Sequence, residues 1–496
     1  MSTPYPEYCR IGMKGLIGGF FEEAANVARE GLRYYPDNVP LLEILAAALY
    51  KQNFFYEACC IGEKAIELDP DNVKCLAVMA SAYTELGLYK PKYFDRVFEV
   101  ADQSNAVDDK NSTGSVAKAF CALTQYDYEK AFEYAQDGLR RSQDSEGAMF
   151  NISLPLLASE RWEEGWFAYD KNLEPRYKDT GMPDFHRPLW SGEPGKIIVA
   201  GEQGIGDELL FASMIPDLQK HHEIIIESSH KIDRLLARSF NCPVYPTRGD
   251  HNAQWKADND ADWWVPMGSL GASFRTKTED FPGTPFLKAD PERRLQWRAV
   301  LDSLPDKPKI GIAWSGGMRR TGENKRSMSL TELYPILEYD AEWISLQYRD
   351  AEDLPDFIHH WSRAAESDDY EDVAALLSEL DLFISVATAA VYCAGGLGVK
   401  TWCLVPDPAP WRYGREGDSM PWFNSIELLR KRDGEWAVQQ VCEKLSAMGI
   451  EKCRDLSILT PVTVQPLAPS GQSLSPLLLK KPGLERFLIT GVEEAA

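Results

Sequence analysis

Apolar and small residues recur at a fixed spacing in the first third of the chain. Residues 20–39 (FFEEAANVAREGLRYYPDNV) match residues 54–73 (FFYEACCIGEKAIELDPDNV) with an offset of 34 positions throughout. Each helical pattern ends at a Pro-Asp-Asn sequence, and proline ends a helix because it lacks an amide hydrogen. The two segments therefore predict one helix that is repeated along the chain.

Small residues in this pattern indicate how the helices pack. Ala24 and Ala58 share one position of the repeat, and Ala131 and Gly165 share it again in later, degenerate units. A small side chain at this position lets two helices approach closely. A 34-residue period with this feature is typical of tetratricopeptide repeats, whose units are pairs of helices.

One unit of the array departs from the period. The segment around Lys90 to Gly114 breaks the register and contains Pro91, so we expect that unit to be distorted or extended. Four to five helical pairs then fill residues 8–175. Such arrays present a concave surface to a peptide, a protein partner or a sister subunit, and a plain spacer or dimerisation arm is an equally open interpretation.

From Lys196 onward, short apolar runs alternate with helical segments. The runs that predict strands are KIIVA (196–200), EIIIES (223–228), KIGIAW (309–314), EWISLQ (342–347), LDLFISV (380–386) and KTWCLV (400–405). Lys231–Phe240 and 388–398 predict helices, and a proline-rich joint around Pro282–Pro291 separates two series of elements. This alternation is typical of doubly wound parallel sheets, which bind ligands at the carboxyl ends of their strands.

The predicted fold class is an α-solenoid followed by an α/β region of two Rossmann-like lobes. The four predicted domains are a tetratricopeptide array over 1–178, a first lobe over 179–300, a second lobe over 301–454 and a Pro/Ser-rich tail over 455–496.

The composition favours a protein that stays in the cytoplasm. Hydrophobic residues make up 44% of the chain, and no run of about 18 apolar residues suggests a membrane span. The first residues, MSTPYPEYCR, lack the basic and apolar stretches of a secretory signal. The ten cysteines are scattered without a CxxC pair and are expected to be reduced thiols.

The net charge of −23 argues against nucleic acid as a partner, because such binding needs clustered Lys and Arg side chains. We expect no metal site, since the acidic Asp258–Asp260 stretch lies just before a strand-like WWVP and fits a solvated loop better. The histidine pairs His221–His222 and His359–His360 are expected at exposed helix or loop positions.

Several motifs, taken in their order and spacing, resemble bacterial tetratricopeptide proteins with a C-terminal heptosyltransferase-like glycosyltransferase region of GT-B fold. These motifs are RWEEGW (161–166), PLWSG (188–192), GEQGIGDELLF (201–211), DWWVPMGSL (262–270), GIAWSGG (311–317), KRSMSL (325–330), WISLQ (343–347), DLFISVATAAVYCAGGLG (381–398) and PWRYGREGDSMPWF (410–423). The resemblance implies inverting, metal-independent transfer of a sugar from a nucleotide-sugar donor in the second lobe. The acceptor hydroxyl, on a protein, a glycan or a lipid-linked molecule, would be held by the first lobe.

A transferred sugar requires a base, because the acceptor hydroxyl loses its proton as it attacks the anomeric carbon. The resemblance gives this role to Asp207, which occupies the position of the family's glycine-aspartate motif. Gln203, Gly204 and Gly206 of the same loop are then expected on the acceptor side. An alternative remains open, because an Asp at this place commonly caps a helix and is then a weak base.

The leaving diphosphate must be neutralised as negative charge develops on it. Ser315, Gly316 and Gly317 follow a predicted strand and offer backbone N–H groups to a phosphate. Lys325 and Arg326 supply positive charge, and a guanidinium binds two phosphate oxygens at once.

Three further residues are candidates for donor binding. Gln347 ends a predicted strand and is expected either to hold the nucleoside or to lie at the surface. Thr388 and Ala389 open a predicted helix, whose first N–H groups attract an anion. For the segment that follows Arg326, the Ser329-x-x-Glu332 pattern leaves open that it only starts a helix.

The chain also departs from the family pattern at two donor-side positions. The family usually has Asp where this chain has Ala387 and His where it has Tyr392, which leaves the identity of the donor open, and activity with it. Trp411, Arg412 and Trp422 are expected either to close the cleft or, for the aromatic residues, to belong to the core.

Three functions therefore stand as hypotheses. The first is a glycosyltransferase whose array recruits the acceptor or a partner. The second is a non-catalytic scaffold with intact repeats beside a degenerate sugar-nucleotide fold. The third is a transferase acting on DNA bases, which the acidity of the chain disfavours.

Overall fold

The structure is a computed structural model of the chain. It describes residues 4–142, 146–171, 173, 182–250, 252–317, 323–349, 351, 354–365, 369–407 and 409–456. All of them except Asp455 and Leu456 belong to one compact unit, which ends at Arg454. The predicted Pro/Ser-rich tail lies outside the described residues apart from Asp455 and Leu456.

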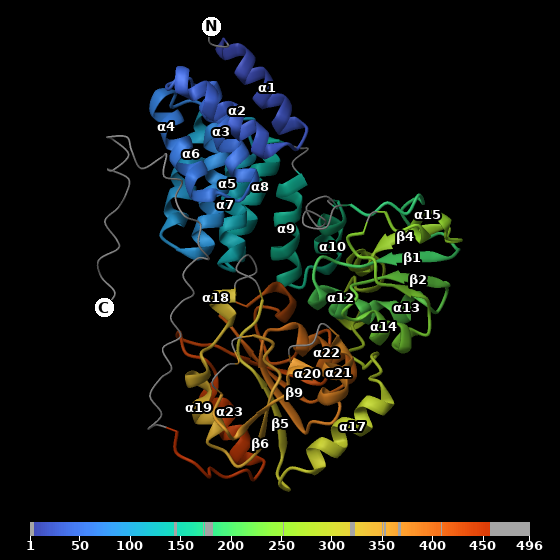
Figure 1. The fold of residues 1–496 in the computed structure, drawn as a ribbon. Helices are drawn as coiled ribbons and strands as arrows, with labels where there is room; N and C mark the ends of the chain where they lie inside the picture. The colour runs from blue at the N-terminus through green and yellow to red at the C-terminus, as the bar shows by residue number, and fades with distance from the viewer. Residues whose placement is uncertain are drawn as a thin grey trace. The chain divides into compact units, whose positions relative to one another are not determined.

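The N-terminal region is a helical solenoid, drawn from blue to teal in Figure 1. Its helices are α1 (Tyr5–Ile17), α2 (Phe21–Tyr34), α3 (Val39–Lys51), α4 (Phe55–Leu68), α5 (Val73–Tyr89), α6 (Tyr93–Val107), α7 (Thr113–Thr124), α8 (Tyr128–Arg141), α9 (Glu146–Ala158) and α10 (Trp162–Asp170). Each odd-numbered helix packs on the even-numbered helix that follows it. The predicted array is confirmed, with five helical pairs among the described residues.

The repeated residues act as the sequence suggests. Ala24, Ala58 and Ala131 are fully buried. A Cβ atom on Gly165 would lie 2.7 Å from Leu157 Cδ2, so this position excludes a side chain. The Asn of the Pro-Asp-Asn sequence starts the next helix, because Asn38 Oδ1 accepts a hydrogen bond from the Leu41 amide at 3.1 Å.

The unit that breaks the period is extended, as predicted. Helix α4 begins 34 residues after α2, but α6 begins 38 residues after α4. The additional residues lengthen α5 to 17 residues, and Pro91 lies in the turn between α5 and α6.

The first α/β lobe contains a four-stranded parallel sheet in the order β3-β2-β1-β4. Its strands are β1 (Ile197–Ala200), β2 (Ile224–Glu227), β3 (Val244–Tyr245) and β4 (Trp263–Pro266), and β4, β1 and β2 lie side by side in Figure 1. The helices of this region are α12 (Ile205–Phe211), η1 (Ala212–Met214), α13 (Ile215–Leu218), α14 (Asp233–Phe240), α15 (Trp255–Asp258), η2 (Met267–Leu270), α16 (Gly271–Phe274), η3 (Thr278–Asp280) and α17 (Pro291–Asp302).

The second lobe contains a six-stranded parallel sheet in the order β10-β9-β8-β5-β6-β7. Its strands are β5 (Lys309–Ala313), β6 (Glu342–Ser345), β7 (Ile358–His360), β8 (Leu382–Val386), β9 (Thr401–Val405) and β10 (Ile426–Arg430). Its helices are α18 (Glu323–Arg326), η5 (Leu330–Leu333), α19 (Tyr334–Leu337), α20 (Ser362–Ala365), α21 (Tyr370–Leu377), α22 (Ala389–Leu397), η6 (Trp411–Tyr413) and α23 (Val438–Ala447). Counted from β5, this is the strand order 3-2-1-4-5-6 of the Rossmann fold.

Two local expectations are decided by these elements. The prediction that His359–His360 is an exposed helix or loop position is wrong, because both residues lie half-buried on strand β7. There His359 Nε2 lies 2.8 Å from a Glu342 carboxylate oxygen. The capping box predicted at Ser329 and Glu332 is present and begins η5.

All ten cysteines are unpaired thiols. Among the described residues, no helix combines the length and the apolar character that crossing a bilayer requires. One buried hydrophobic cluster runs from α7–α10 of the solenoid through both α/β lobes. The solenoid and the lobes therefore share a core.

Candidate functional site

In each sheet the strands that follow one another in the chain are added first on one side of the first strand and then on its other side. The place where the side changes is the topological switch point, and ligands are expected there. In the first sheet β1 lies between β2 and β4, and in the second β5 lies between β6 and β8. The loops that leave the neighbouring strands at such a point run to opposite faces of the sheet, which opens a crevice at their carboxyl ends. The loops to consider are therefore those after β1, β5 and β8.

The loop after β1 feeds directly into helix α12. Gly204 is the N-cap of α12, and Gln203 lies half-buried just before it. A Cβ atom on Gly206 would lie 3.5 Å from the Tyr392 ring and 3.6 Å from Ala389 Cβ, both on α22 of the second lobe. The glycine-rich loop of the first lobe therefore packs against the start of α22.

Asp207 lies in the first turn of α12, and its carboxylate forms an ion pair with the Arg412 guanidinium of η6. Because Gly204 takes the cap position, Asp207 is not the helix cap that the sequence left open. Both side chains keep some contact with solvent, at 31% for Asp207 and 22% for Arg412. Burial lowers the pKa of Arg412, but the Asp207 carboxylate and nearby tyrosines raise it by more than burial lowers it. The net change is a rise, so the guanidinium stays charged.

The loop after β5 is shaped by its neighbours. A Cβ atom on Gly316 would lie 2.5 Å from Thr388 Cγ2, and one on Gly317 would overlap the Arg326 guanidinium. Gly317 also has a φ of +90°, which favours glycine. The glycines that the sequence singled out therefore allow Thr388 and Arg326 to approach the loop backbone.

The Gln347 side chain holds the loop after β5 through four hydrogen bonds to Trp314 and Ser315. Its Oε1 accepts hydrogen bonds from the Trp314 and Ser315 amides, and its Nε2 donates to the Ser315 carbonyl and to Ser315 Oγ. The side chain is fully buried. The expectation of a surface position is therefore wrong, and the Gln347 amide holds Ser315. A nucleoside contact by Gln347 stays a prediction.

Lys325 and Arg326 end the short helix α18 close to this loop. Arg326 faces Gly317, as described, whereas Lys325 turns toward the solenoid, with Nζ 5.7 Å from the centre of the Tyr126 ring. Burial lowers the pKa of Lys325. Arg326 and Arg412 both act electrostatically on Tyr126 and Tyr392, so the two guanidinium groups belong to one cluster.

The loop after β8 provides a helix start. Thr388 is the N-cap of α22, so the first N–H groups of this helix, including that of Ala389, point out of its N-terminus. Ala387 and Tyr392, where the family has Asp and His, are both buried. Burial raises the pKa of Tyr392 while Arg412 opposes that rise, and the ring lies 6.0 Å from the Tyr413 ring.

Trp411 and Trp422 belong to an aromatic cluster with Trp166 of the solenoid and Phe211 of α12. Ring centroids within this cluster lie 5.9–6.4 Å apart. Both tryptophans are nearly fully buried. The core interpretation therefore applies to both tryptophans. The expectation that they close the cleft stays a prediction.

Glu208 is a site-adjacent residue that sequence reasoning missed. Its side chain is fully buried, and its carboxylate accepts hydrogen bonds from Arg248 at 2.6 Å and from the Ser228 hydroxyl at 2.8 Å. Burial raises its pKa to about 7, although Arg248 and Ser228 favour the charged form. The Asp207–Glu208 pair at the start of an apolar helix was the available signal.

The acidic stretch Asp258–Asp260 lies at the end of α15, so Asp258 is the last residue of a helix and only the residues after it form a loop; Asp258 and Asp260 are exposed. Asp260 pairs with Lys196 at 2.7 Å, and Asp258 accepts a hydrogen bond from Gln254. Within the described residues no group of three or more His, Cys, Asp or Glu side chains is arranged to hold a metal ion.

No family profile matches the chain. It is 29% identical over 352 residues to Protein FlbA of Caulobacter vibrioides, a match that covers 64% of this chain and 58% of the relative. The chain thus spans less than two thirds of the length of that relative.

Two solved structures resemble part of the chain. TTC0263, a thermophilic TPR protein of Thermus thermophilus, is 18% identical with a TM-score of 0.32, and the match covers 36% of this chain and 93% of that one. MamA from Desulfovibrio magneticus RS-1, residue 41 to the end, is 16% identical with a TM-score of 0.30, over 35% and 96% of the two chains.

Proposed function

We propose that this chain is a glycosyltransferase that uses a nucleotide-sugar donor, with its two lobes as the halves of a GT-B fold. The observation that carries the proposal is the meeting of the two switch-point loops. Gly206 of the first lobe packs on the start of α22, and Asp207 pairs with Arg412 of the second lobe. Open α/β sheets bind ligands outside the carboxyl ends of their strands at a switch point, so two switch points that meet can bring two substrates together.

The donor phosphate would be bound by groups of the second lobe. Arg326 and Arg412 supply positive charge, and the N-terminus of α22 at Thr388 and Ala389 supplies N–H donors. In the loop Ser315–Gly317 the Ser315 amide already donates to Gln347 Oε1 and the Gly316 amide to Ser327 Oγ, so the loop would offer the Gly317 N–H to the phosphate. Together these groups would stabilise the negative charge that develops on the leaving phosphate.

The proposed reaction is a single displacement. The acceptor oxygen bonds to the anomeric carbon, the bond from that carbon to the phosphate oxygen breaks, and its electron pair leaves on the nucleotide. Asp207 takes the proton of the acceptor hydroxyl. The carbon is attacked from the side opposite the leaving group, so its configuration inverts.

Asp207 is not available as a base while it is paired with Arg412. A donor phosphate near Arg412 offers the guanidinium a second anion, which would draw it away from the Asp207 carboxylate. Donor binding would thereby release the base, and the acceptor would react only after the donor is in place.

The helical array would bring the acceptor or a protein partner to the first lobe. Arrays of this kind bind partners through an extended surface. Whether that surface holds the acceptor itself is tested by transfer assays on the full chain with protein, glycan and lipid-linked acceptors.

A non-catalytic scaffold is the second candidate, and a specific observation favours it. The aromatic cluster of Trp166, Phe211, Trp411 and Trp422 packs solenoid, first lobe and second lobe together. The Asp207–Arg412 pair adds to this contact. A fold kept for its shape alone would preserve the same packing.

One experiment separates the two candidates. The full chain is incubated with UDP-, GDP-, ADP-, TDP- and CMP-sugars, and thermal stabilisation and slow hydrolysis of the donor are measured. A ligand at about 100 times its Kd stabilises the native state by about 2.7 kcal/mol, which is readily detected. Binding accompanied by hydrolysis supports the transferase, and binding without hydrolysis or transfer under any condition supports the scaffold. The CMP-sugar tests whether one phosphate suffices.

A further inference from the structure

The turn between α7 and α8 has an unusual residue at its tightest position. In four of the five helical pairs, the residue before the N-cap of the second helix has a positive φ. These residues are Gly19 at 77°, Asn53 at 64°, Tyr126 at 57° and Glu160 at 58°. Glycine and asparagine tolerate this conformation, but an aromatic side chain does not favour it. Glu160 also occupies this position without being glycine or asparagine, so Tyr126 is distinguished by the groups that its ring contacts.

The Tyr126 side chain faces α18, the helix that ends at Arg326. Its exposed fraction is 9%, and the ring faces the Lys325 ammonium of α18 at 5.7 Å. Burial raises the pKa of Tyr126, and Arg326 and Arg412 oppose that rise, so both guanidinium groups lie within electrostatic reach of the ring.

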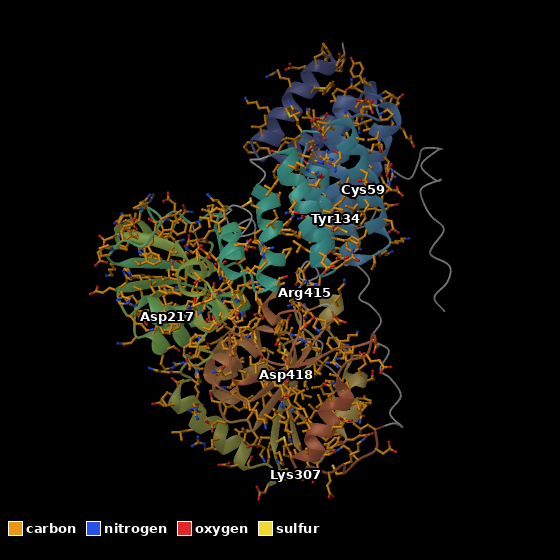
Figure 2. All side chains as sticks on the ribbon, turned by 180° about the vertical axis from the view of Figure 1, so that it is seen from behind. Cys59, Tyr134, Asp217, Lys307, Arg415 and Asp418 are labelled. Carbon is orange, nitrogen blue, oxygen red and sulfur yellow. The ribbon has the colours of Figure 1, made fainter. Side chains whose placement is uncertain are left out.

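The residues that follow Tyr126 also contact the second lobe, through one hydrogen bond and one ion pair. The Tyr128 hydroxyl donates a hydrogen bond to the Ala409 carbonyl at 2.8 Å. Glu129 pairs with Arg415, labelled in Figure 2, at 2.8 Å. The turn thus contacts both segments that carry the site's cations, α18 before Arg326 and the loop before Arg412.

We propose that Tyr126 is a positioning residue of the donor site, which holds Lys325, and with it the adjoining Arg326, at the phosphate-binding loop. The helical array would then contribute a residue that positions the donor site, in addition to binding an acceptor or a partner. This inference rests on the proposed function, because the ligand in question is the phosphate of a nucleotide-sugar.

The test compares substitutions in the full-length chain. Tyr126→Asn places in this turn the residue that Asn53 provides in the α3–α4 turn, so strain is relieved while the ring is lost. We expect Tm to fall, because the ring that is lost is buried in the core shared by the solenoid and the lobes, and nucleotide-sugar binding to weaken roughly two- to thirtyfold, the range of a cation–π contact. The donor KM should rise more than kcat falls. Tyr126→Phe keeps the ring and should retain binding, and Asn53→Gly is the control for the turn itself.

A double-mutant cycle guards against a merely structural effect. Lys325→Gln should weaken donor binding as Tyr126→Asn does, and the double variant should lose no more than either single variant. If Tyr126→Asn binds the donor as tightly as the unaltered chain, or if the two losses add, the inference is wrong. If the unaltered chain binds no nucleotide-sugar of the panel, the proposed function fails and the inference with it.

Discussion

Asp207 and Arg412 are separated by 205 residues in the sequence, yet their side chains form an ion pair where the two lobes meet. One comes from the first turn of α12, after β1, and the other from η6, after β9. The pair therefore joins a candidate base to a candidate phosphate ligand. The availability of the Asp207 carboxylate as a base and that of the Arg412 guanidinium as a phosphate ligand therefore depend on each other.

Removing the carboxylate should separate catalysis from donor binding. With Asp207→Asn we expect sugar transfer to fall by about 10²–10⁴-fold, the usual contribution of a general base, while nucleotide-sugar binding survives. Binding could even strengthen, because Arg412 would no longer be held by a carboxylate. The measurement is donor binding by calorimetry beside transfer under saturating donor. Transfer near the level of the unaltered chain would remove Asp207 from the mechanism.

Removing the Arg412 guanidinium should weaken donor binding, which the loss of the Asp207 carboxylate should leave intact. With Arg412→Gln the donor phosphate loses a charged partner, so binding should weaken by roughly tenfold or more, as expected for loss of a charge-assisted hydrogen bond. Arg298→Gln is the matched control, since Arg298 is a half-exposed residue of α17 that pairs with Glu379. Equal effects of the two substitutions on donor binding would contradict the assignment.

Gly317→Ala should displace Arg326. The added methyl group would overlap the Arg326 guanidinium, and the φ of +90° disfavours alanine in any case. Gly434→Ala isolates the backbone cost, because Gly434 has a φ of 81° and an added Cβ there meets no atom within 4 Å. Both variants should lose stability by about 1 kcal/mol, but only Gly317→Ala should also weaken nucleotide-sugar binding. The comparison uses Tm and donor affinity side by side.

The parts of the fold that were predictable from sequence are those with a strong local pattern. The 34-residue offset identified the solenoid, and continuous apolar runs such as Leu382–Val386 identified strands buried on both faces. Strand β3 is only two residues long, and β7 carries two histidines, so neither has a recognisable apolar run. Strand β10 (Ile426–Arg430) has the charged Glu427 at its second position and Arg430 at its end, so it has no continuous apolar run either.

For the candidate site, sequence identified the loops but not the partners of their side chains. Glycines and helix starts have local signatures, which is why Gly316 and Thr388 were found. The ion pair of Asp207 with Arg412 and the four hydrogen bonds of Gln347 depend on how distant segments fold together. No local pattern encodes such contacts.

Glu208 should make stability depend on pH in a defined direction. Its pKa rises from 4.5 to about 7 in the folded protein because the carboxyl group is fully buried. Between these values the folded state holds a proton that the unfolded state has released, so this contribution to stability is complete below about pH 4.5 and is lost as pH rises through 7.

The variant that isolates this effect is Glu208→Gln. From pH 4.5 to pH 7.5 the unaltered chain should lose about 3 kcal/mol of unfolding free energy relative to Glu208→Gln, the equivalent of the shift in pKa. Urea unfolding of both proteins at the two pH values measures the difference, and other titrating groups cancel in the comparison. Parallel pH profiles would mean that Arg248 keeps the carboxylate charged throughout.

Trp166 should be essential to the joint between solenoid and lobes, whereas its neighbour Phe167 should not. Trp166 is fully buried, its indole N–H donates to the Arg275 carbonyl at 2.9 Å, and its ring fills the space over Gly271. Trp166→Ala should therefore cost about 3–5 kcal/mol, the usual cost of truncating a buried aromatic residue.

Phe167 is 59% exposed on the same helix, so Phe167→Ala should change stability by no more than about 0.5 kcal/mol. Chemical unfolding followed by circular dichroism gives both values. Because the Trp166 ring contacts Phe211, Trp411 and Trp422 of both lobes, Trp166→Ala should also loosen their contact and lower donor affinity. A large loss of stability with unchanged donor affinity would show that the lobes hold their site without the solenoid, which would favour the array as a recruiting arm alone.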